Sequence, residues 1–544
     1  MNTACQDNVN LTVGSAVLPL LEKMGVETIF GIPGVHTIEI YRGISRTSIR
    51  HITPRHEQGA GFMADGYARV SGKPGVCLVI TGPGMTNILT AMAQARADSV
   101  PMLVISAVNP ISNDQNELGL LHELPDQGAL VRQVAISSLT VTKSAELIPA
   151  LKNSFAKMLS NRPGPVHIEI PTDIQKLLPD FNPEDANMAY EISEDQLDQS
   201  IIVNIADRLN EAKKPLMILG GGAQACNQYL SELIEIIGAQ AITTINARGL
   251  LGGHPLCIPA SPSLACVRQN ILEADVVLAI GTEFGKTDFD LYGDGDFPPI
   301  EYLIRVDISE VQLTKNIKPN MTVQSSATKF CEQLLREIKG RGFVPKKVIQ
   351  PKVHTQKIRE KCLNEIESKL RNPLDLILRL VNHFPEAILV GDSTQPIYAG
   401  NLYNNVKKAG NWFNSATGYG TLGYAIPSAL GAKLASPISP VIGIIGDGGF
   451  QFTSSELMTA SDESIPVVFI VWNNNGYKEI KDSMTMEGIS PVGVTPKPPN
   501  FKLQAQSYDL PYYLVENRDD LIKIVTTALE RDLPTIIEIL ETTY

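Results

Sequence analysis

The stretch IIGDGGFQFTSSELMTASDESIPVVFIVWNNNGY, residues 444–477, decides the fold. An apolar run at 441–445, which overlaps the start of this stretch, predicts a buried strand. A second run at 466–472 predicts the next strand. Thr453 and Glu456 have capping-box spacing, which predicts that the intervening helix starts there. Two buried strands joined by a helix form a parallel crossover, so the stretch predicts an α/β fold.

Polar residues follow both predicted strands. The turn Gly446, Asp447, Gly448 and Gly449 has little side-chain bulk, so its backbone N–H groups can approach an anion. Asn474 lies 27 positions after Asp447, at the end of the second strand. Because the two strand ends meet at one edge of a parallel sheet, Asp447, Asn474 and the carbonyl of Gly476 can share a cation such as magnesium or calcium. Each motif alone also fits an ordinary turn; the pair at this spacing predicts a metal-held phosphate.

Other short apolar runs alternate with helical patterns along the chain. Those that predict buried parallel strands lie at 76–80, 101–108, 215–222, 275–281, 387–392, 440–448 and 465–475. Two stretches, 177–196 and 340–352, have the composition of linkers. We therefore predict an α/β protein of three doubly wound domains with parallel sheets, at 1–176, 197–340 and 370–544.

Composition narrows the class of protein. The net charge of -12 over 544 residues argues against non-specific binding to nucleic acid, which needs a basic excess. The seven cysteines are dispersed without a CxxC pair, which indicates reduced thiols. The apolar runs are shorter than the ~20 residues of a membrane helix, and the N-terminus lacks the pattern of a signal peptide. We expect a cytoplasmic protein with no membrane or nucleic-acid partner.

The stretch 446–477 resembles the diphosphate-binding signature of thiamine diphosphate enzymes, which begins with GDG and ends in NN. The resemblance implies that Asp447, Asn474 and the Gly476 carbonyl bind Mg²⁺, and that the metal binds the diphosphate of the cofactor. It also implies that residues next to these ligands line the cofactor, namely Gly446, Gly448, Gly449 and Tyr477.

Two runs near the N-terminus, HEQGAGFMADGYAR (56–69) and VCLVITGPGMTN (76–87), resemble the pyrimidine-binding domain of the acetolactate synthase superfamily. FGIPGVHTIEIY (30–41) is similar to an early strand–turn segment of that family. The resemblance implies that Glu57 is the catalytic carboxylate that activates the cofactor, and that Gly82, Gly84 and Asn87 line it. Taken alone, Glu57 has the simpler explanation of an acid at a helix N-terminus.

Two further segments resemble parts of the same cofactor site. In GYGTLGYAIPSALGAK (418–433), Leu422 would be the apolar wedge between the two cofactor rings, and the Gly420 carbonyl would accept the pyrimidine amino group. Core packing is the alternative for Leu422. In GDSTQP (391–396), Thr394 and Gln395 would lie near the diphosphate.

The resemblance also implies a reaction and an assembly. The reaction is decarboxylation of a small 2-oxo acid through a carbanion/enamine on the cofactor, which supplies the chemistry that side chains lack. The assembly is a homodimer or homotetramer with active sites between subunits.

The substrate is suggested by finer features. GIPGVHTIEIYRG (31–43), LLHELPDQGAL (120–130) and TDFDLYGDGDF (287–297) look more like 5-guanidino-2-oxopentanoate decarboxylase than acetolactate synthase. Glu479 and Asp482, one helical turn apart, can supply carboxylates to a guanidinium group, or they are surface acids. His122 is a second catalytic candidate, with an ordinary loop histidine as the alternative.

Alternatives stay open at this point. Acetolactate synthase, joining two pyruvates, is the first, although residues 279–297 lack the arginines that accompany flavin binding in its central domain. The GGGAQA run (220–225) lacks GxGxxG spacing, so we interpret it as the edge of the central sheet, and FAD is possible but not favoured. A catalytically silent thiamine diphosphate-binding protein is the third possibility, and the presence of both Glu57 and the metal motif argues against it.

Overall fold

A computed structural model describes residues 11–111, 118–192, 197–288, 297–343 and 349–544. The chain divides into two compact units, Met1–Ser193 and Glu194–Tyr544.

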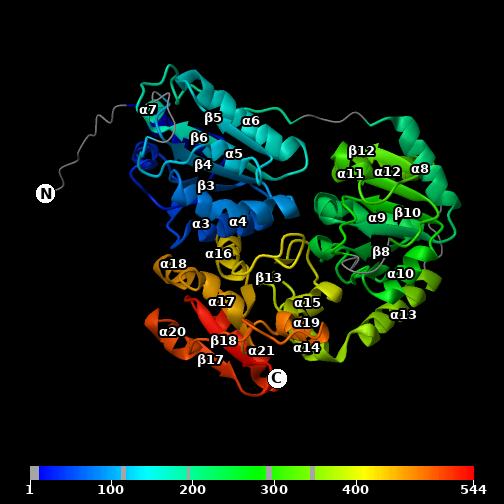
Figure 1. Ribbon diagram of the computed structural model, residues 1–544. Coiled ribbons are helices and arrows are strands. Elements are labelled where there is room, and N and C mark those ends of the chain that lie inside the picture. The colour runs from blue at the N-terminus through cyan, green and yellow to red at the C-terminus, as the bar shows by residue number, and fades with distance from the viewer. Residues whose placement is uncertain (1–10, 112–117, 193–196, 289–296, 344–348) are drawn as a thin grey trace. The chain divides into compact units, whose positions relative to one another are not determined.

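The first unit is one six-stranded parallel sheet in the order β2-β1-β3-β4-β6-β5 (Figure 1). Its strands are β1 (Thr28–Gly31), β2 (Arg50–Ile52), β3 (Gly75–Val79), β4 (Met102–Val108), β5 (Ser137–Thr140) and β6 (Pro165–Pro171). Its helices are α1 (Val13–Lys23), α2 (Ile38–Tyr41), α3 (Glu57–Ser71), α4 (Pro83–Asp98), α5 (Gln127–Val131), α6 (Leu147–Ser160) and α7 (Thr172–Gln175).

Alternate residues of the strands in this sheet pack against different helices. Val76 and Leu78 of β3 share a core with α1 and α6. Cys77, between them, donates from Sγ to the backbone oxygen of Ala60 in α3. Successive side chains of a strand point to opposite faces, so α1 and α6 cover one face and α3 covers the other. Coverage of both faces explains why these strands are continuous apolar runs.

The second unit holds two more parallel sheets of six strands each. The first has the order β12-β11-β10-β7-β8-β9 and consists of β7 (Pro215–Leu219), β8 (Gln240–Thr243), β9 (Cys257–Ile258), β10 (Val276–Ile280), β11 (Leu303–Asp307) and β12 (Met321–Gln324). Its helices are α8 (Gln199–Glu211), α9 (Asn227–Ile237), α10 (Ala265–Leu272), α11 (Glu310–Thr314), α12 (Ala327–Gly340) and α13 (Ile349–Glu365).

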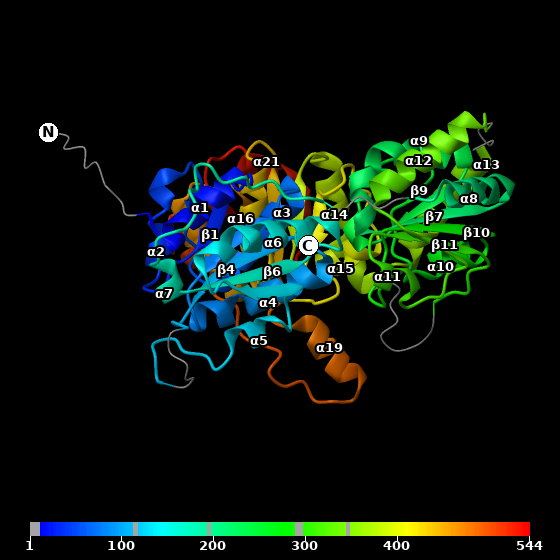
Figure 2. The ribbon, with the colours of Figure 1, turned by 90° about the horizontal axis from the view of Figure 1, so that it is seen from above.

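The last sheet has the order β14-β13-β15-β16-β18-β17. Its strands are β13 (Ile388–Gly391), β14 (Trp412–Asn414), β15 (Val441–Gly446), β16 (Val468–Asn473), β17 (Tyr512–Val515) and β18 (Thr535–Leu540). Its helices are α14 (Ser368–His383), α15 (Gln395–Leu402), α16 (Ala425–Ala435), α17 (Asp447–Thr453), α18 (Glu456–Asp462), α19 (Lys478–Met486), α20 (Phe501–Ser507) and α21 (Leu521–Leu529). Figure 2 shows α19 standing away from the sheet, and none of its residues is buried.

The two sheets of the second unit are joined by a fully buried arginine. Arg248 donates to the backbone and hydroxyl oxygens of Thr243 at the end of β8, and its other terminal nitrogen donates to the backbone oxygen of Asn401 in α15 at 2.9 Å. Burial lowers the pKa of Arg248 to about 10, which leaves it charged at neutral pH. The side chain therefore supplies donors to a carbonyl of β8 and to a carbonyl of α15, a helix of the last sheet.

The predicted fold class is confirmed: the three sheets are parallel, with helices packed around them. A helix, α18, begins at Glu456, but the expected capping box is wrong, and another helix precedes it. That helix, α17, begins at Asp447, directly after β15, and the Thr453 hydroxyl donates to the Gly423 backbone oxygen at 2.7 Å. Glu456 instead accepts from the Thr459 hydroxyl within α18. The domain boundaries stay predictions.

In the described part of the chain, no helix combines the length and apolar character needed to cross a membrane.

Candidate functional site

In the first unit, the predicted site residues follow three strands of the sheet, β2, β3 and β4, at their carboxyl ends. Glu57 opens α3 after β2, and Gly82, Gly84 and Asn87 lie at or near the start of α4 after β3. His122 lies in the segment that follows β4. Ligands of open α/β sheets bind beyond this edge, so the fold places these residues where a cofactor is expected.

Glu57 is buried and already has a partner. Asn87 donates from Nδ2 to Glu57 Oε2 at 2.9 Å. A Cβ added at Gly84 would lie 3.4 Å from Glu57 Oε1 and 2.8 Å from the Ile80 side chain. Three of the residues that the sequence predicts for one site, Glu57, Gly84 and Asn87, are therefore brought together.

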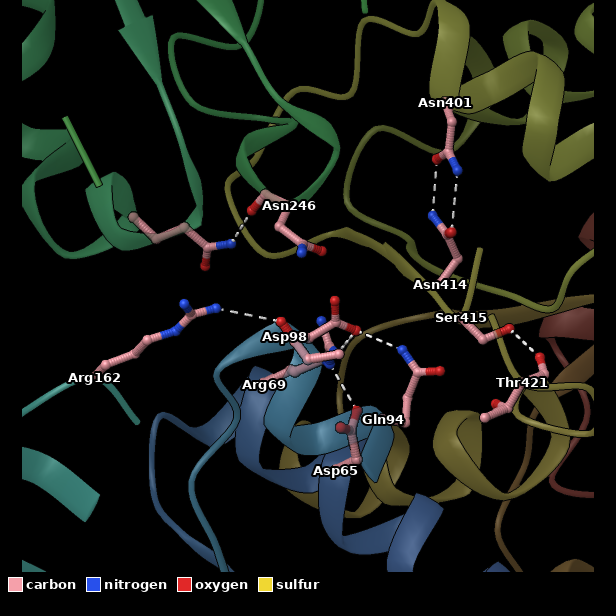
Figure 3. A network of polar contacts seen from close by, with 12 residues as sticks. Asp65, Arg69, Gln94, Asp98, Arg162, Asn246, Asn401, Asn414, Ser415 and Thr421 are labelled. Carbon is pink, nitrogen blue, oxygen red and sulfur yellow. Dashed lines mark hydrogen bonds and ion pairs between the residues drawn. The ribbon is translucent and has the colours of Figure 1, made fainter. Parts of the chain in front are cut away.

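A polar network holds the two helices that carry Glu57 and Asn87. Arg69 of α3 donates to Asp65 at 2.6 Å and to Asp98 of α4 at 2.7 Å, and Gln94 also donates to Asp98 (Figure 3). Asp65 is fully buried, so the ion pair is shielded from water and its geometry is fixed. Sequence reasoning did not identify this network, although Asp65 and Arg69 lie in the quoted run at 56–69.

Gly82 fixes the position of the His122 segment. Its φ of 66° lies in the left-handed region, and an added Cβ would lie 2.4 Å from the His122 backbone oxygen. Its N–H donates to Gln127 Oε1 at 2.9 Å, and the Gln127 amide nitrogen donates in turn to Ser106, Ala107 and Glu169. Gln127 was missed by the sequence analysis, although it lies in the quoted run LLHELPDQGAL.

A second histidine lies against His122. The rings of His36 and His122 meet edge to face, with centroids 5.3 Å apart. His36 follows β1 within FGIPGVHTIEIY, where the sequence analysis noted the segment but did not identify the histidine. Burial lowers the pKa of His36, and the charge of protonated His122 adds to this effect.

In the second unit, three oxygen atoms meet at the metal motif. Asn474 Oδ1 lies 2.8 Å from the Gly476 backbone oxygen and 3.2 Å from Asp447 Oδ1. Asp447 is buried, and its carboxylate accepts from the backbone N–H of Gly476 at 2.8 Å and of Asn474 at 3.4 Å. Ligands at right angles around Mg²⁺ lie about 3 Å apart, since each is ~2.1 Å from the ion. Asn474 Oδ1 therefore lies at the spacing of a magnesium site from each of the other two predicted ligands.

The orientation of the Asn474 amide bears on the metal. A flip would replace the two oxygen–oxygen contacts by N–H donations to Gly476 and Asp447. It would also remove the donation of Nδ2 to Gln395 Oε1 at 3.3 Å. A cation among the three oxygens satisfies them without the flip and retains the bond to Gln395, which also accepts from the Trp472 indole at 3.2 Å. The residues present thus fit a divalent cation.

Burial disfavours the negative charge of Asp447 when no cation lies beside it. Burial raises the pKa of Asp447, and the donated backbone N–H groups partly oppose that rise. Among the described residues, no group of three His, Cys, Asp or Glu side chains could hold a metal ion. A metal at Asp447 therefore depends on the amide and carbonyl oxygens of Asn474 and Gly476.

The glycines of the GDGG segment make room for neighbouring side chains. An added Cβ would lie 3.0 Å from Thr394 Oγ1 at Gly446, 2.5 Å from the Tyr477 ring at Gly448 and 3.0 Å from Asp392 Oδ1 at Gly449. Thr394 and Tyr477 are thereby brought to the motif, as the sequence predicts.

Asp392 organises the segment around Gly420 and Leu422. It is fully buried and accepts from the backbone N–H groups of Ser393 at 2.8 Å and Ala425 at 3.2 Å. Burial raises its pKa to about 6. Ser415 adds a bond from its hydroxyl to the Thr421 backbone oxygen at 2.7 Å (Figure 3). Sequence reasoning missed Asp392, since only its place in GDSTQP pointed to it.

The bend segment itself remains accessible. Gly420 is exposed with a φ of 77°, and Leu422 is half-buried. Leu422 therefore keeps surface available for a ligand in addition to its packing.

The two predicted substrate carboxylates lie on α19, directly after the metal motif. Glu479 accepts from the Gln395 amide at 3.2 Å and lies 3.7 Å from Lys369 Nζ. Asp482 accepts from Lys478 at 2.9 Å. Burial raises the pKa of Glu541, and the carboxylates of Asp482, Glu479 and Asp447 add to this rise while Lys478 opposes it. The region beside the metal motif thus holds four carboxylates, those of Asp447, Glu479, Asp482 and Glu541, and two lysines are paired with them.

The glycine-rich run GGGAQA (220–225) has a structural explanation. A Cβ at Gly220 would lie 2.1 Å from the Gly281 backbone oxygen, so close packing at the ends of β7 and β10 requires a glycine there. The run follows β7, an interior strand, and lies at the carboxyl-end edge of the sheet. Most of the segment TDFDLYGDGDF falls at 289–296, outside the described residues.

Comparisons with known proteins agree with this geometry. Family models of the thiamine pyrophosphate enzymes match the chain in three places: the N-terminal TPP-binding domain at 11–130, the central domain at 202–334 and the C-terminal TPP-binding domain at 392–539. The chain therefore belongs to the thiamine pyrophosphate enzyme family. It is an enzyme, and its cofactor is thiamine pyrophosphate.

Among individual relatives, a probable 2-ketoarginine decarboxylase of Pseudomonas aeruginosa is 38% identical over 98% of this chain and 95% of its own length. The large subunit of acetolactate synthase isozyme 1 of Escherichia coli is 29% identical over 96% of this chain and 92% of its own. The acetolactate synthase large subunit of Corynebacterium glutamicum is 30% identical over 97% of this chain and 84% of its own.

Proposed function

We propose that the chain decarboxylates 5-guanidino-2-oxopentanoate, also called 2-ketoarginine, with thiamine pyrophosphate and Mg²⁺. The observation that carries the cofactor half of this proposal is the position of Asn474 Oδ1 at magnesium spacing from both Asp447 Oδ1 and the Gly476 oxygen. When bound, the cofactor supplies the carbon nucleophile and accepts the electrons released with CO₂.

The residues of this chain would share the remaining tasks. Asp447, Asn474 and Gly476 hold Mg²⁺, which binds the diphosphate, and Gly446, Gly448, Gly449, Thr394, Gln395 and Tyr477 surround it. Glu57 holds a proton at a pyrimidine nitrogen, and Asn87 orients the Glu57 carboxylate through the 2.9 Å bond. Leu422 and the Gly420 carbonyl support the bend between the rings, and Gly82 and Gly84 leave space for the pyrimidine.

The acidic region beside the metal motif supports a cationic substrate. Glu479, Asp482 and Glu541 are near enough to one another to shift the pKa of Glu541, and Glu479 is linked to the metal motif through Gln395. A guanidinium group forms charge-assisted hydrogen bonds with carboxylates. The identity to the Pseudomonas aeruginosa relative, whose name specifies 2-ketoarginine, supports the same substrate.

The test is a CO₂-release screen with pyruvate, benzoylformate and 5-guanidino-2-oxopentanoate, with aldehyde and acetolactate measured as products. We expect the guanidino acid to give the highest kcat/KM and its aldehyde as product. Acetolactate from pyruvate at a higher kcat/KM would overturn the substrate choice in favour of a synthase. No CO₂ from any of the three acids would contradict the decarboxylase and favour a silent cofactor-binding protein.

A charge substitution on α19 sharpens the substrate assignment. Glu479→Gln should raise KM for 5-guanidino-2-oxopentanoate about tenfold or more, because loss of one charge-assisted bond of about 1.5 kcal/mol corresponds to a tenfold change. KM for an uncharged 2-oxo acid should stay unchanged. Glu487→Gln, which removes an exposed carboxylate from the end of the same helix, is the matched control. An equal change in KM for both substrates would show that Glu479 does not recognise the guanidinium group.

We further propose that the enzyme works as a homodimer or homotetramer whose active sites form between subunits. The resemblance to the acetolactate synthase superfamily supports this assembly. Sedimentation velocity, with and without cofactor, tests it: a monomer that is fully active at assay concentration would contradict it.

A further inference from the structure

Two cysteines that the cofactor site does not use meet between two helices of the second unit. Cys266 lies in α10 and Cys362 in α13, and their Sγ atoms are 3.2 Å apart although 96 positions separate the two residues in the chain. Bonded sulfur atoms of a disulfide lie about 2.05 Å apart, so the two thiols need to approach by about 1 Å to become bonded. The pair is therefore a dithiol close to bonding distance.

The two thiols differ in their exposure to solvent. Cys362 is fully buried, whereas Cys266 is the one cysteine that is not buried among the six that the structure describes. A small oxidant that arrives from solvent therefore meets the sulfur of Cys266 first, and Cys362 lies behind it as a second thiol.

Glu365 fixes Cys266 in this position. Its Oε1 accepts from the backbone N–H of Cys266 at 2.9 Å, and this N–H is one of the donors that the start of α10 leaves without a partner inside the helix. Glu365 and Cys362 lie three positions apart on α13 and so share a face of that helix. One face of α13 thus contacts Cys266 at both its backbone and its sulfur, which keeps the two thiols together.

α13 rests on the central sheet by a narrow stripe of residues. Between positions 350 and 365, where the side chains are described, the buried residues are Thr355, Ile358 and Cys362. Ile358 and Cys362 pack in one core with residues of β7, β8 and β10 and with Leu370 of α14. Cys362 lies in the last turn of α13, just before the chain enters α14 of the last sheet. A covalent bond at Cys362 would therefore tie the connection between the two sheets to α10.

We propose that Cys266 and Cys362 form an oxidation site for a hydroperoxide, in which Cys266 reacts first and Cys362 closes a disulfide. The bond ties α13 to α10 while the oxidant is in excess, and a thiol reductant restores the two thiols by thiol–disulfide exchange.

The reaction takes place in two balanced steps. The Cys266 sulfur attacks one peroxide oxygen and the O–O bond breaks, so that R–SH plus H₂O₂ gives R–SOH plus H₂O. The Cys362 sulfur then displaces the hydroxyl group from Cys266, and this hydroxyl leaves with the Cys362 proton as a second water. The two thiols together lose two electrons and two protons, and the peroxide is reduced to two waters.

The surroundings of Cys266 make this reaction slow. The contact with Cys362 raises the pKa of the Cys266 thiol, and burial and the Glu365 carboxylate add to the rise. Because the thiolate is the reactive form of cysteine, the pair stays reduced under mild conditions and reacts when peroxide is sustained.

A second cysteine pair of the same unit is the matched control. Cys226, just before α9, and Cys331 of α12 pack in one core, and the contact with Cys226 raises the pKa of the Cys331 thiol. Both side chains are fully buried. Because neither sulfur is open to solvent, we expect this pair to stay reduced under conditions that oxidise Cys266 and Cys362.

The test treats the full chain with hydrogen peroxide, unfolds it in iodoacetamide to block the remaining thiols, and maps disulfides by mass spectrometry of its peptides. We expect a bond between Cys266 and Cys362 that dithiothreitol reverses, with Cys226 and Cys331 recovered as blocked thiols. The bond should also raise the unfolding temperature of the second unit by several degrees, because a cross-link over 96 positions restricts the unfolded chain. Differential scanning calorimetry measures this rise.

Two variants separate the steps. In Cys362→Ala the second step is blocked, so the sulfenic acid on Cys266 should persist and be trapped by dimedone. In Cys266→Ser no dimedone label should appear on Cys362, because that sulfur is buried. Neither variant should show the peroxide-dependent rise in unfolding temperature.

Each contrary result would overturn a stated part of the proposal. Cys266 and Cys362 that both remain free thiols after peroxide treatment would overturn the oxidation site. Equal oxidation of the Cys226 and Cys331 pair would also overturn it, because unfolding rather than exposure would then control the reaction. A dimedone label on Cys362 in Cys266→Ser would overturn the order of the steps. An unchanged unfolding temperature of the disulfide-bonded protein would overturn the tie between α13 and α10.

Discussion

At the scale of single residues, the site depends on a few carboxylates whose neighbours decide what each can do. Glu57 and Asp447 are both buried acids, yet their surroundings differ. An amide from Asn87 meets Glu57, whereas backbone N–H groups and the Asn474 amide oxygen meet Asp447. The first arrangement suits a group that exchanges a proton, and the second suits a metal ligand.

Glu57→Gln should separate activation from binding. The amide has nearly the same shape but cannot carry the negative charge that holds a proton at the pyrimidine nitrogen, so kcat should fall about 10²–10⁴-fold. The affinity for thiamine pyrophosphate, measured by isothermal titration calorimetry, should change less than about fivefold, or 1 kcal/mol. Glu27→Gln, at an exposed carboxylate of the same unit, is the control. Full activity in Glu57→Gln would refute the assignment.

Asp447→Asn should weaken the metal site. Loss of the only charged ligand among the three oxygens should raise the Mg²⁺ concentration needed for half-maximal cofactor binding by at least about tenfold, or 1.4 kcal/mol. The readout is calorimetry over a magnesium series. Asp509→Asn makes the same charge change at an exposed position, where a φ of 56° is one that asparagine tolerates. Unaltered magnesium dependence in Asp447→Asn would exclude Asp447 as a ligand.

At the scale of elements, close backbone packing decides where glycine is required. Gly72 and Gly82 have nearly equal φ values of 70° and 66°. A Cβ at Gly72 would meet nothing within 4 Å, whereas a Cβ at Gly82 would meet the His122 backbone at 2.4 Å. The two positions differ in backbone strain as well as in packing, because Gly72 has a ψ of 6°, in the αL region, whereas Gly82 has a ψ of -104°, outside it.

Gly72→Ala should cost about 1 kcal/mol, the strain of a left-handed alanine alone. Gly82→Ala should cost several times as much, because the clash with backbone atoms requires the His122 segment to move. Thermal unfolding of the two variants measures the difference, and limited proteolysis around residue 122 reports the movement. Equal destabilisation would show that the His122 segment does not constrain Gly82.

The element scale also shows how far the sequence can lead. Apolar runs located the strands, because strands covered on both faces have little choice of residue. The helix start at Glu456 was found, but α17 before it was missed and the cap was wrong, because Thr453 bonds to Gly423, 30 positions away. Asp392 and Gln127 were missed for the same reason: each acts on backbone groups far from it in sequence, and local patterns contain no information about such contacts.

At the scale of the whole chain, the two sheets of the second unit are linked by buried contacts between them. Arg248 donates to a carbonyl of β8 in one sheet and to a carbonyl of α15, which packs on the other. Gly249 and Gly252 lie against the backbone of Lys408 and Lys407. We therefore expect these two sheets to unfold together. The sequence could not predict this, since the linker composition at 340–352 suggests independent domains and gives no sign of Arg248.

Arg248→Ala should lower the unfolding temperature of the second unit by several degrees. The variant leaves three acceptors without their donor and opens a cavity, at a cost of about 2–5 kcal/mol. Differential scanning calorimetry would measure the fall in the unfolding temperature and would show whether the second unit unfolds in one transition or in two. Arg336→Ala, an exposed arginine of α12, should have little effect. A second unit that melts in two separate steps in the wild type would contradict the linkage.

The bond between Trp472 and Gln395 has a practical consequence. The chain has only two tryptophans, and both lie buried in one sheet, Trp412 in β14 and Trp472 in β16. Trp472 Nε1 shares the Gln395 oxygen with Asn474, which belongs to the metal motif. Intrinsic indole emission therefore reports on the last sheet alone, and the colour of that emission should respond when an ion or diphosphate reorders the amides beside Trp472. The fluorescence of Trp472 should therefore report whether the metal motif is occupied.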